Sequence, residues 1–229
     1  SLDQPVAPFL DPQLAALGLS PLASLFGAEA ASITARHLAT MRSGIPDYDT
    51  ATPSVSKSDP FRAKVYSAPG TAYPPAQLLN LSWVSLGHLQ FRPGSAFAYS
   101  STNFVLLGLL LAALTRSPRW SAFDQATVLA SLPERQRQLY RAMRFALHST
   151  PRAWDAVGGF DRTSYNGAKS TARPGRDVSA VVGVFAGWTA SDLVAPAKDV
   201  ARFGYDLYGL QGTPVSYTHL RAHETVDYL

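Results

Sequence analysis

The sequence predicts a globular, mainly helical protein with one expected strand. Residues 104–114 form an apolar run that directly follows a polar cluster, the composition of a buried helix. In residues 75–86 the apolar side chains recur at helical spacing after a proline, which favours a helix start. Hydrophobic residues make up 46% of the 229 residues, enough for a packed core in one large domain or two small ones. Residues 178–188 are apolar and are expected to form a strand that enters a turn.

The composition excludes several classes of function. The chain has no cysteine, which rules out disulfides, thiolate catalysis and zinc sites with cysteine ligands. No apolar run reaches the roughly 20 residues that a membrane-spanning helix needs. The net charge of +4 is spread along the chain, and its densest basic patch is interpreted as a solvated helix face. That patch consists of Arg135, Arg137, Arg141 and Arg144. We therefore expect no cofactor, no metal, no nucleic-acid partner and no membrane span.

Residues 32–46 predict a helix with recognisable signals at both ends. Ser32 or Thr34 can cap its start, Gly44 can take the left-handed position at its end, and Pro46 prevents its continuation. His37 lies on this helix without a second metal ligand at helical spacing, so we expect it to be a surface or cap residue.

The long polar stretch at residues 47–75 contains a Ser-x-x-Lys pattern, formed by Ser54 and Lys57. On a helix this spacing brings a lysine amine beside a serine hydroxyl, the arrangement of a nucleophile and its base. However, Pro53 and Pro60 flank the pattern, and no apolar face accompanies it. We interpret it as a chance match within a long loop of the kind that often borders a binding site.

Residues 91–104 combine a turn, two aromatic side chains and a helix start. Pro93 and Gly94 mark the turn, and the polar residues 100–103 stand where a helix needs its N-cap. The Tyr99 hydroxyl is therefore expected at the mouth of a buried helix, where main-chain N–H groups favour negative charge. A phenol held there could transfer protons. The structural alternative is a half-buried aromatic residue followed by ordinary cap residues.

The segments after the buried helix carry no recognisable chemistry. Residues 121–148 predict one long helix or two shorter ones, and residues 154–176 predict a surface loop. A further helix is expected to start at Pro196, and Asp192 and Asp199 are interpreted as cap and dipole partners.

The last residues of the chain, 213–229, change character and look like a translated adapter sequence. We predict that they are a non-native tail and leave them out of the fold. His219 and His223 within them have the spacing of a metal pair, but the chain lacks the His-Glu-x-x-His pattern of a zinc protease. They are therefore not expected to bind a metal.

Three motifs in a fixed order resemble the serine β-lactamase and D,D-peptidase family of class C β-lactamases, penicillin-binding proteins and their esterase and aminopeptidase relatives. They are the Ile-Thr to Ser-Gly stretch at 33–44, the Pro-Gly, Tyr-Ser-Ser and Leu-Leu-Gly stretch at 93–108, and the Gly-Trp to Arg-Phe stretch at 187–203. One departure is Met41, where relatives have a histidine whose role is structural. The resemblance implies an α+β fold in residues 1–212, with mainly its helical part present and most of its antiparallel sheet missing.

For function, the resemblance implies a serine hydrolase that forms an acyl-enzyme with amide or ester substrates, such as β-lactams, D-Ala peptides or esters. It is similar in this respect to D,D-carboxypeptidases and esterases. By position, Tyr99 is the implied general base or proton relay and Ser101 the implied substrate-binding residue. Many relatives have asparagine at the position of Ser101. Serine offers a hydroxyl there but lacks the paired donor and acceptor of the asparagine amide. Substrate preference therefore stays open.

The resemblance also implies that this chain is a fragment truncated at both ends. The family's Ser-x-x-Lys helix is expected upstream of Ser1 and its Lys-Thr-Gly-like strand downstream of Gly212, so the fragment is expected to be inactive. A full-length protein of this family would be periplasmic or secreted and would act on a small-molecule or peptide substrate, in an oligomeric state that the sequence leaves open. The alternative is a relative that keeps the scaffold, lacks the nucleophile and binds ligands without turnover.

Overall fold

The computed structural model describes residues 1–49, 60–117, 119–123, 134, 138, 140, 142–146, 150–157, 159–161 and 176–208. The chain divides into two compact units. The first consists of Ser1–Asp124 and Phe145–Leu193, and the second of Gln125–Arg144 and Val194–Leu229. The predicted tail at 213–229 lies outside the described residues, as do Ser54 and Lys57.

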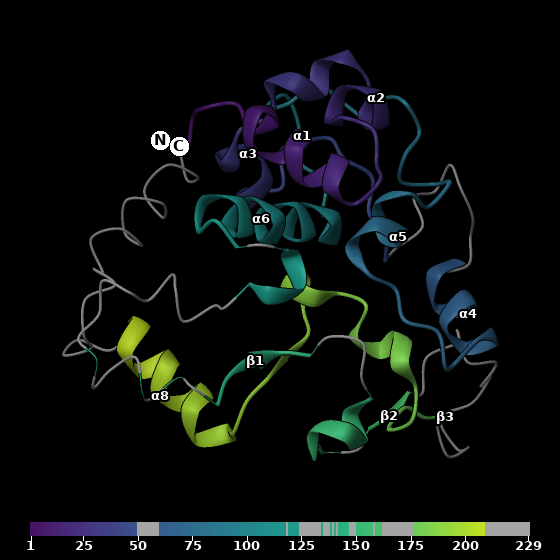
Figure 1. Cartoon of the computed structure of the whole chain (residues 1–229), viewed down its shortest axis with the longest axis vertical. Coiled ribbons are helices and arrows are strands. Elements are labelled where there is room, and N and C mark those ends of the chain that lie inside the picture. The colour runs from purple at the N-terminus through teal and green to yellow at the C-terminus, as the bar shows by residue number, and fades with distance from the viewer. Residues whose placement is uncertain are drawn as a thin grey trace. The chain divides into compact units, whose positions relative to one another are not determined.

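Helices dominate the first unit (Figure 1). The α-helices are α1 (Ala7–Ala16), α2 (Leu22–Phe26), α3 (Ala35–Ala39), α4 (Pro60–Ser67), α5 (Pro75–Leu79) and α6 (Ser101–Leu114). The 3-10 helices are η1 (Ala28–Ser32), η2 (Trp120–Ala122), η4 (Pro151–Trp154), η6 (Val182–Phe185) and η7 (Trp188–Ala190).

The strands of the described residues are short. β1 (Arg144–Phe145) pairs with β4 (Leu193–Val194). β2 (Phe160–Asp161) pairs antiparallel with β3 (Arg176–Asp177), and Phe160 lies opposite Asp177 in the register. The expected α+β class, with mainly helices and little antiparallel sheet, is confirmed.

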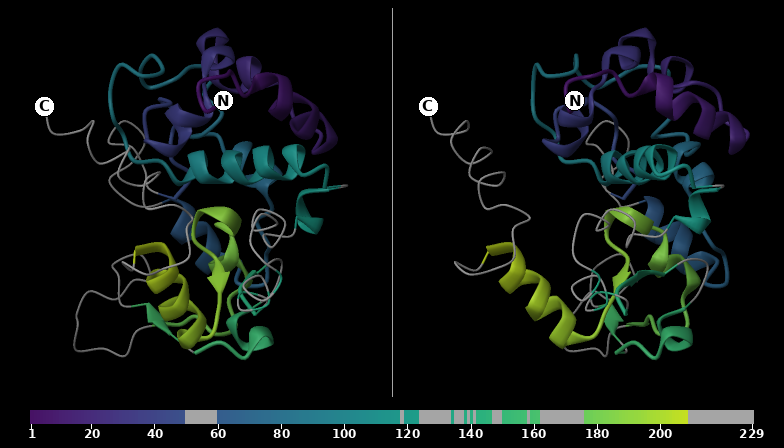
Figure 2. Two further views of the ribbon diagram at one scale, coloured as in Figure 1. Left: turned by 90° about the vertical axis from the view of Figure 1, so that its left-hand side faces the viewer. Right: turned by 60° about the vertical axis from the view of Figure 1, so that its left-hand side comes forward.

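Helix α6 lies at the centre of the first unit, and α1, α3, α5 and η7 pack against it (Figures 1 and 2). Val105, Leu106 and Leu109 are fully buried on this helix, which confirms the prediction of a buried helix at 104–114. Burial of such side chains is the main driving force for holding α6 in place. No α-helix among the described residues is long and apolar enough to span a lipid bilayer.

The helix predicted at 32–46 is much shorter than expected, because it ends at Ala39. Its start is as predicted: the Thr34 side chain accepts the His37 N–H, and the His37 ring accepts the Thr34 N–H, so His37 is a cap residue. Beyond the end, Met41 and Gly44 have positive φ angles of 59° and 80°. A Cβ atom at Gly44 would lie 2.2 Å from the Phe91 carbonyl oxygen, so this turn requires glycine.

The helix predicted at 75–86 is also shorter, since α5 ends at Leu79. Leu81 and Val84 are nevertheless buried, in hydrogen-bonded turns that follow the helix. The helical spacing of the apolar residues therefore predicted their burial correctly but not the length of α5.

The strand predicted at 178–188 is wrong, because η6 and η7 occupy this segment. A short apolar run does not distinguish a strand from other buried structure. Here the run is apolar because it is packed: a Cβ atom at Gly183 would lie 2.9 Å from Val65 Cγ1. Farther back, Arg144 and Phe145 form β1 instead of the end of a helix, and β2 begins within the expected loop at 154–176.

The second unit contains α8 (Ala197–Tyr208), which begins one residue after Pro196 and has Asp199 in its first turn, as predicted. The rings of Tyr140 and Phe203 pack edge to face, with centroids 5.8 Å apart. The Tyr140 hydroxyl donates to the Asp206 carboxylate, which also pairs with Arg202.

Candidate active site

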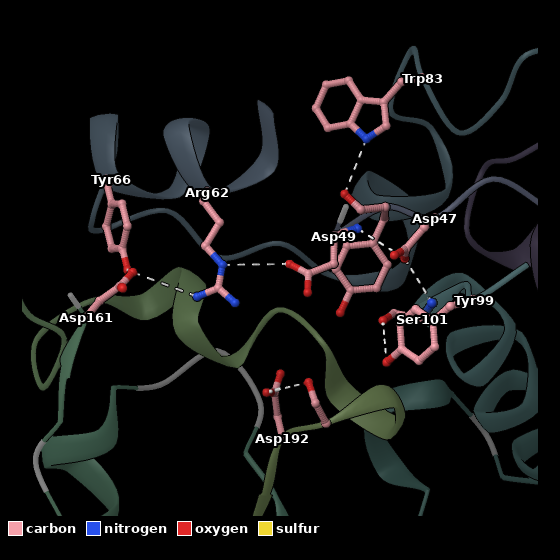
Figure 3. A network of polar contacts seen from close by, with 11 residues as sticks. Asp47, Asp49, Arg62, Tyr66, Trp83, Tyr99, Ser101, Asp161 and Asp192 are labelled. Atoms are coloured by element: carbon pink, nitrogen blue, oxygen red, sulfur yellow. Dashed lines mark hydrogen bonds and ion pairs between the residues drawn. The ribbon is translucent and has the colours of Figure 1, made fainter. Parts of the chain in front are cut away.

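Tyr99 and Ser101, the two predicted site residues, lie together at the start of α6 (Figure 3). The Ser101 hydroxyl donates to the Tyr99 hydroxyl oxygen at 3.4 Å, a long hydrogen bond. The Tyr99 side chain is 61% exposed, whereas Ser101 is 6% exposed. The structure thus brings a solvent-accessible phenol next to a buried serine, at a helix end that favours negative charge.

The carboxylate of Asp47 caps this helix from another segment. Ser100 occupies the N-cap position, but its side chain makes no capping hydrogen bond. Instead, the Ser101 N–H donates to Asp47 Oδ1 at 2.9 Å, and the Asp49 N–H donates to the same oxygen at 3.2 Å. Asp47 is 3% exposed. Its negative charge is therefore placed where the helix dipole stabilises it.

The next two residues of α6 are bonded to the same loop. Thr102 Oγ1 donates to the Pro46 carbonyl at 2.8 Å and accepts the Tyr48 N–H at 3.0 Å. The Ser43 hydroxyl donates to Asn103 Oδ1 at 2.7 Å. Residues 101–103 and the loop at 43–48 therefore form one continuous, buried contact, which we call the α6 clamp.

Met41 and Ser100 complete the surroundings of the clamp. The Asn103 amide donates to Met41 Sδ at 3.4 Å, and Met41 is buried, so this residue has a structural position. The Ser100 hydroxyl is buried and has no hydrogen-bond partner among the described residues. Buried hydroxyls are normally paired, so Ser100 is a polar group that this part of the structure leaves unsatisfied.

A row of charged and polar residues extends from Asp49 through Arg62 to Tyr66 (Figure 3). The Arg62 guanidinium lies 4.0 Å from the Asp49 carboxylate and 3.9 Å from that of Asp161. The Tyr66 hydroxyl donates to Asp161. Burial, together with this bond to a carboxylate, raises the pKa of Tyr66 to about 12. Asp49, Arg62 and Tyr66 line part of a cavity of about 80 Å³, which does not include Tyr99 or Ser101.

Asp192 directly follows Ser191, one of the residues that line this cavity. Asp192 accepts the Trp188 N–H at 2.9 Å and the Ser191 hydroxyl at 3.1 Å. Burial raises the pKa of this carboxyl to about 7. Burial of the Tyr48 side chain, together with the nearby Asp192 carboxylate, raises the pKa of the Tyr48 hydroxyl. Asp192 thus caps the start of η7.

The described residues contain no group of three or more His, Asp or Glu side chains that could hold a metal ion. His219 and His223 lie outside them. Sequence reasoning missed the role of Asp47. The sequence does hold a signal for a cap, because an aspartate directly follows the residues Gly44 to Pro46. Nothing local to that segment, however, indicates which helix the Asp47 carboxylate caps.

Comparisons with known proteins identify the family and the fold of this chain. The family model described as Beta-lactamase matches residues 1–226. No curated protein sequence matches significantly. Among solved structures, the chain is similar to a D-stereospecific amidohydrolase from Streptomyces sp., with 24% identity and a TM-score of 0.58 over 90% of this chain and 52% of that one.

The chain is also similar to the D-amino acid amidase from Ochrobactrum anthropi SV3. The complex with D-phenylalanine has 20% identity and a TM-score of 0.57 over 91% of this chain and 49% of that one. The complex with L-phenylalanine amide matches equally well, with 48% of its chain covered. At this identity the likeness is one of fold. The chain spans about half the length of these solved relatives.

Proposed function

Because this chain belongs to the β-lactamase family, we propose that it is part of a serine hydrolase that cleaves amide or ester bonds through an acyl-enzyme. The observation that carries the proposal is the placement of Tyr99, an exposed residue whose hydroxyl lies 3.4 Å from Ser101 Oγ at the start of a buried helix. In this proposal Tyr99 transfers the proton of the nucleophilic serine, and Ser101 contacts the substrate.

The chemistry follows from what a phenol can do. The serine hydroxyl attacks the substrate carbonyl, its proton passes by way of Tyr99 to the leaving amine or alcohol, and the C–N or C–O bond breaks. An ester between serine and the acyl group remains. Water then attacks this ester, the C–O bond to the serine oxygen breaks, and the free acid leaves while a proton of the water passes by way of Tyr99 to the serine oxygen. A tyrosine hydroxyl both donates and accepts a hydrogen bond, so one residue can serve both steps.

The substrates proposed are β-lactams, D-Ala peptides and esters. Amides of D-amino acids join them, because two structurally similar proteins are a D-stereospecific amidohydrolase and a D-amino acid amidase. Ser101 offers a single hydroxyl to such a substrate. Since Ser101 is mostly buried, this hydroxyl can serve only a group that reaches the start of α6.

We also propose that residues 1–229 alone are inactive, because the nucleophile is supplied from outside this sequence. Ser54 and Lys57 have the nucleophile's spacing, but prolines flank them on both sides. Ser54→Ala is therefore expected to leave the activity of the full-length protein unchanged. Loss of acylation in that variant would overturn this part of the proposal.

The test uses the full-length protein, a penicillin, D-phenylalanine amide and a p-nitrophenyl ester. Intact-mass spectrometry is expected to detect an acyl adduct with at least one of them. Tyr99→Phe is expected to lower kcat by about 10²–10⁴-fold, the usual contribution of proton transfer. The control is Tyr205→Phe, which removes the hydroxyl of a tyrosine on α8 that is similarly exposed, at 53%. Ligand binding without any adduct would instead identify a non-catalytic relative.

A further inference from the structure

We infer that Asp47 is a positioning residue for Tyr99. Its carboxylate holds the main chain at the start of α6, and thereby the tyrosine two residues before Ser101. The inference rests on the proposed function in one respect, because the place of Tyr99 matters for catalysis only if Tyr99 transfers protons.

The main chain must place Tyr99, because little else in the described residues does. Tyr99 is 61% exposed and the nearby Phe97 is 66% exposed. A ring with so little packing is located mainly by its backbone. That backbone is held on both sides by the same loop: the Ala98 N–H donates to the Met41 carbonyl at 3.1 Å, and the Ser101 N–H donates to Asp47 at 2.9 Å.

The bond from Asp47 has no substitute in the described structure. The first N–H groups of a helix have no partner within it, and the Ser100 side chain does not cap α6. Ser101 and Asp47 are both buried, so water cannot easily replace a lost acceptor. A hydrogen bond to a carboxylate is also roughly twice as strong as one between neutral groups.

The Thr102 and Asn103 bonds of the α6 clamp are made by groups other than the Asp47 carboxylate, which also accepts the Asp49 N–H. Thr102 stays bonded to Pro46 and Tyr48, and Asn103 stays bonded to Ser43. Removing the carboxylate should therefore loosen the chain before Thr102 and leave α6 beyond it in place. Because the expected effect is confined to this segment, an experiment can distinguish a positioning role of Asp47 from a general loss of stability.

The first experiment measures amide hydrogen exchange in the full-length protein by NMR. In Asp47→Ala the Ser101 amide is expected to exchange about tenfold faster or more, while the amides of 105–110 are unchanged. In Asp47→Asn, which keeps an acceptor oxygen, the Ser101 rate is expected to return toward that of the native chain. Unchanged exchange at Ser101 in Asp47→Ala would overturn the inference.

Asp11→Ala is the matched control. Asp11 Oδ1 accepts the Leu22 N–H at 2.9 Å, the same kind of bond at the start of α2. This variant is expected to speed exchange at Leu22 and to leave Ser101 unchanged. If it speeds exchange at Ser101 as well, the effect of Asp47 is not local and the inference fails.

The second experiment measures acylation by the full-length protein in a double-mutant cycle. If Asp47 acts through Tyr99, Asp47→Ala lowers kcat in the native background but has little further effect in Tyr99→Phe. Independent, multiplying effects would overturn the inference. If Tyr99→Phe alone changes nothing, the proposed function fails, whereas exchange at Ser101 still decides whether Asp47 holds this segment.

Discussion

Gly108→Ala is expected to destabilise the protein, although alanine is the better helix former. Alanine in the middle of α6 should gain about 1 kcal/mol from helix propensity. Its Cβ atom, however, would lie 2.2, 2.6 and 2.8 Å from the Oγ1, Cγ2 and Cβ atoms of Thr189. Rotating the Thr189 side chain does not remove the contact with its Cβ, so η7 has to move away from α6.

The size of the effect follows from these contacts. Overpacking of this kind costs about 1–3 kcal/mol. Movement of Thr189 also loses its hydrogen bond to the Phe104 carbonyl, which is 2.8 Å long and contributes about 1 kcal/mol. After subtraction of the propensity gain, the free energy of unfolding should fall by about 1–3 kcal/mol. The corresponding fall in Tm is about 2–4 °C per kcal/mol for a chain of this size.

Urea unfolding followed by tryptophan fluorescence is the assay. Trp188 begins η7, and its ring centroid lies 5.1 Å from that of Trp120, so the signal reports on this contact. Gly204→Ala is the control, because a Cβ atom at Gly204 meets nothing within 4 Å, and it should stabilise α8 by about 0.5–1 kcal/mol. If Gly108→Ala is as stable as the native protein, or more so, the reasoning is refuted.

Two further predictions concern buried polar groups. The pKa of Asp192 is about 7 in the folded state against an ordinary 3.8, so the folded state binds this proton more tightly. The free energy of unfolding should therefore fall by up to about 4 kcal/mol as pH rises from about 4 to about 7. Asp192→Asn should remove this pH dependence. A free energy of unfolding of the native protein that stays constant over this pH range would contradict the prediction. Thr102→Val leaves the Pro46 carbonyl and the Tyr48 N–H unpaired and should lower the free energy of unfolding by about 2–4 kcal/mol, whereas Thr102→Ser should retain both bonds. Equal thermal stability of the two variants would count against the α6 clamp.

Local signals in the sequence predicted several elements correctly. The buried helix at 104–114, the cap formed by Thr34 and His37 and the helix start at Pro196 all depend on residues within a few positions of one another. Helix ends were less predictable. α3 ends at Ala39 because Met41 and Gly44 take left-handed conformations that serve contacts with a distant segment, not the helix itself.

Sequence patterns alone predicted the burial of the apolar residues at 104–114, the starts of α3, α5, α6 and α8, and the segments that resemble the β-lactamase family. Three contacts became visible in the folded chain alone: Asp47 accepts the Ser101 N–H, Thr102 is bonded to Pro46 and Tyr48, and Asp192 is buried beside Tyr48. Apolar periodicity and caps are short-range properties of the chain, whereas a buried hydrogen bond depends on which distant segments pack together and exclude water from the groups between them.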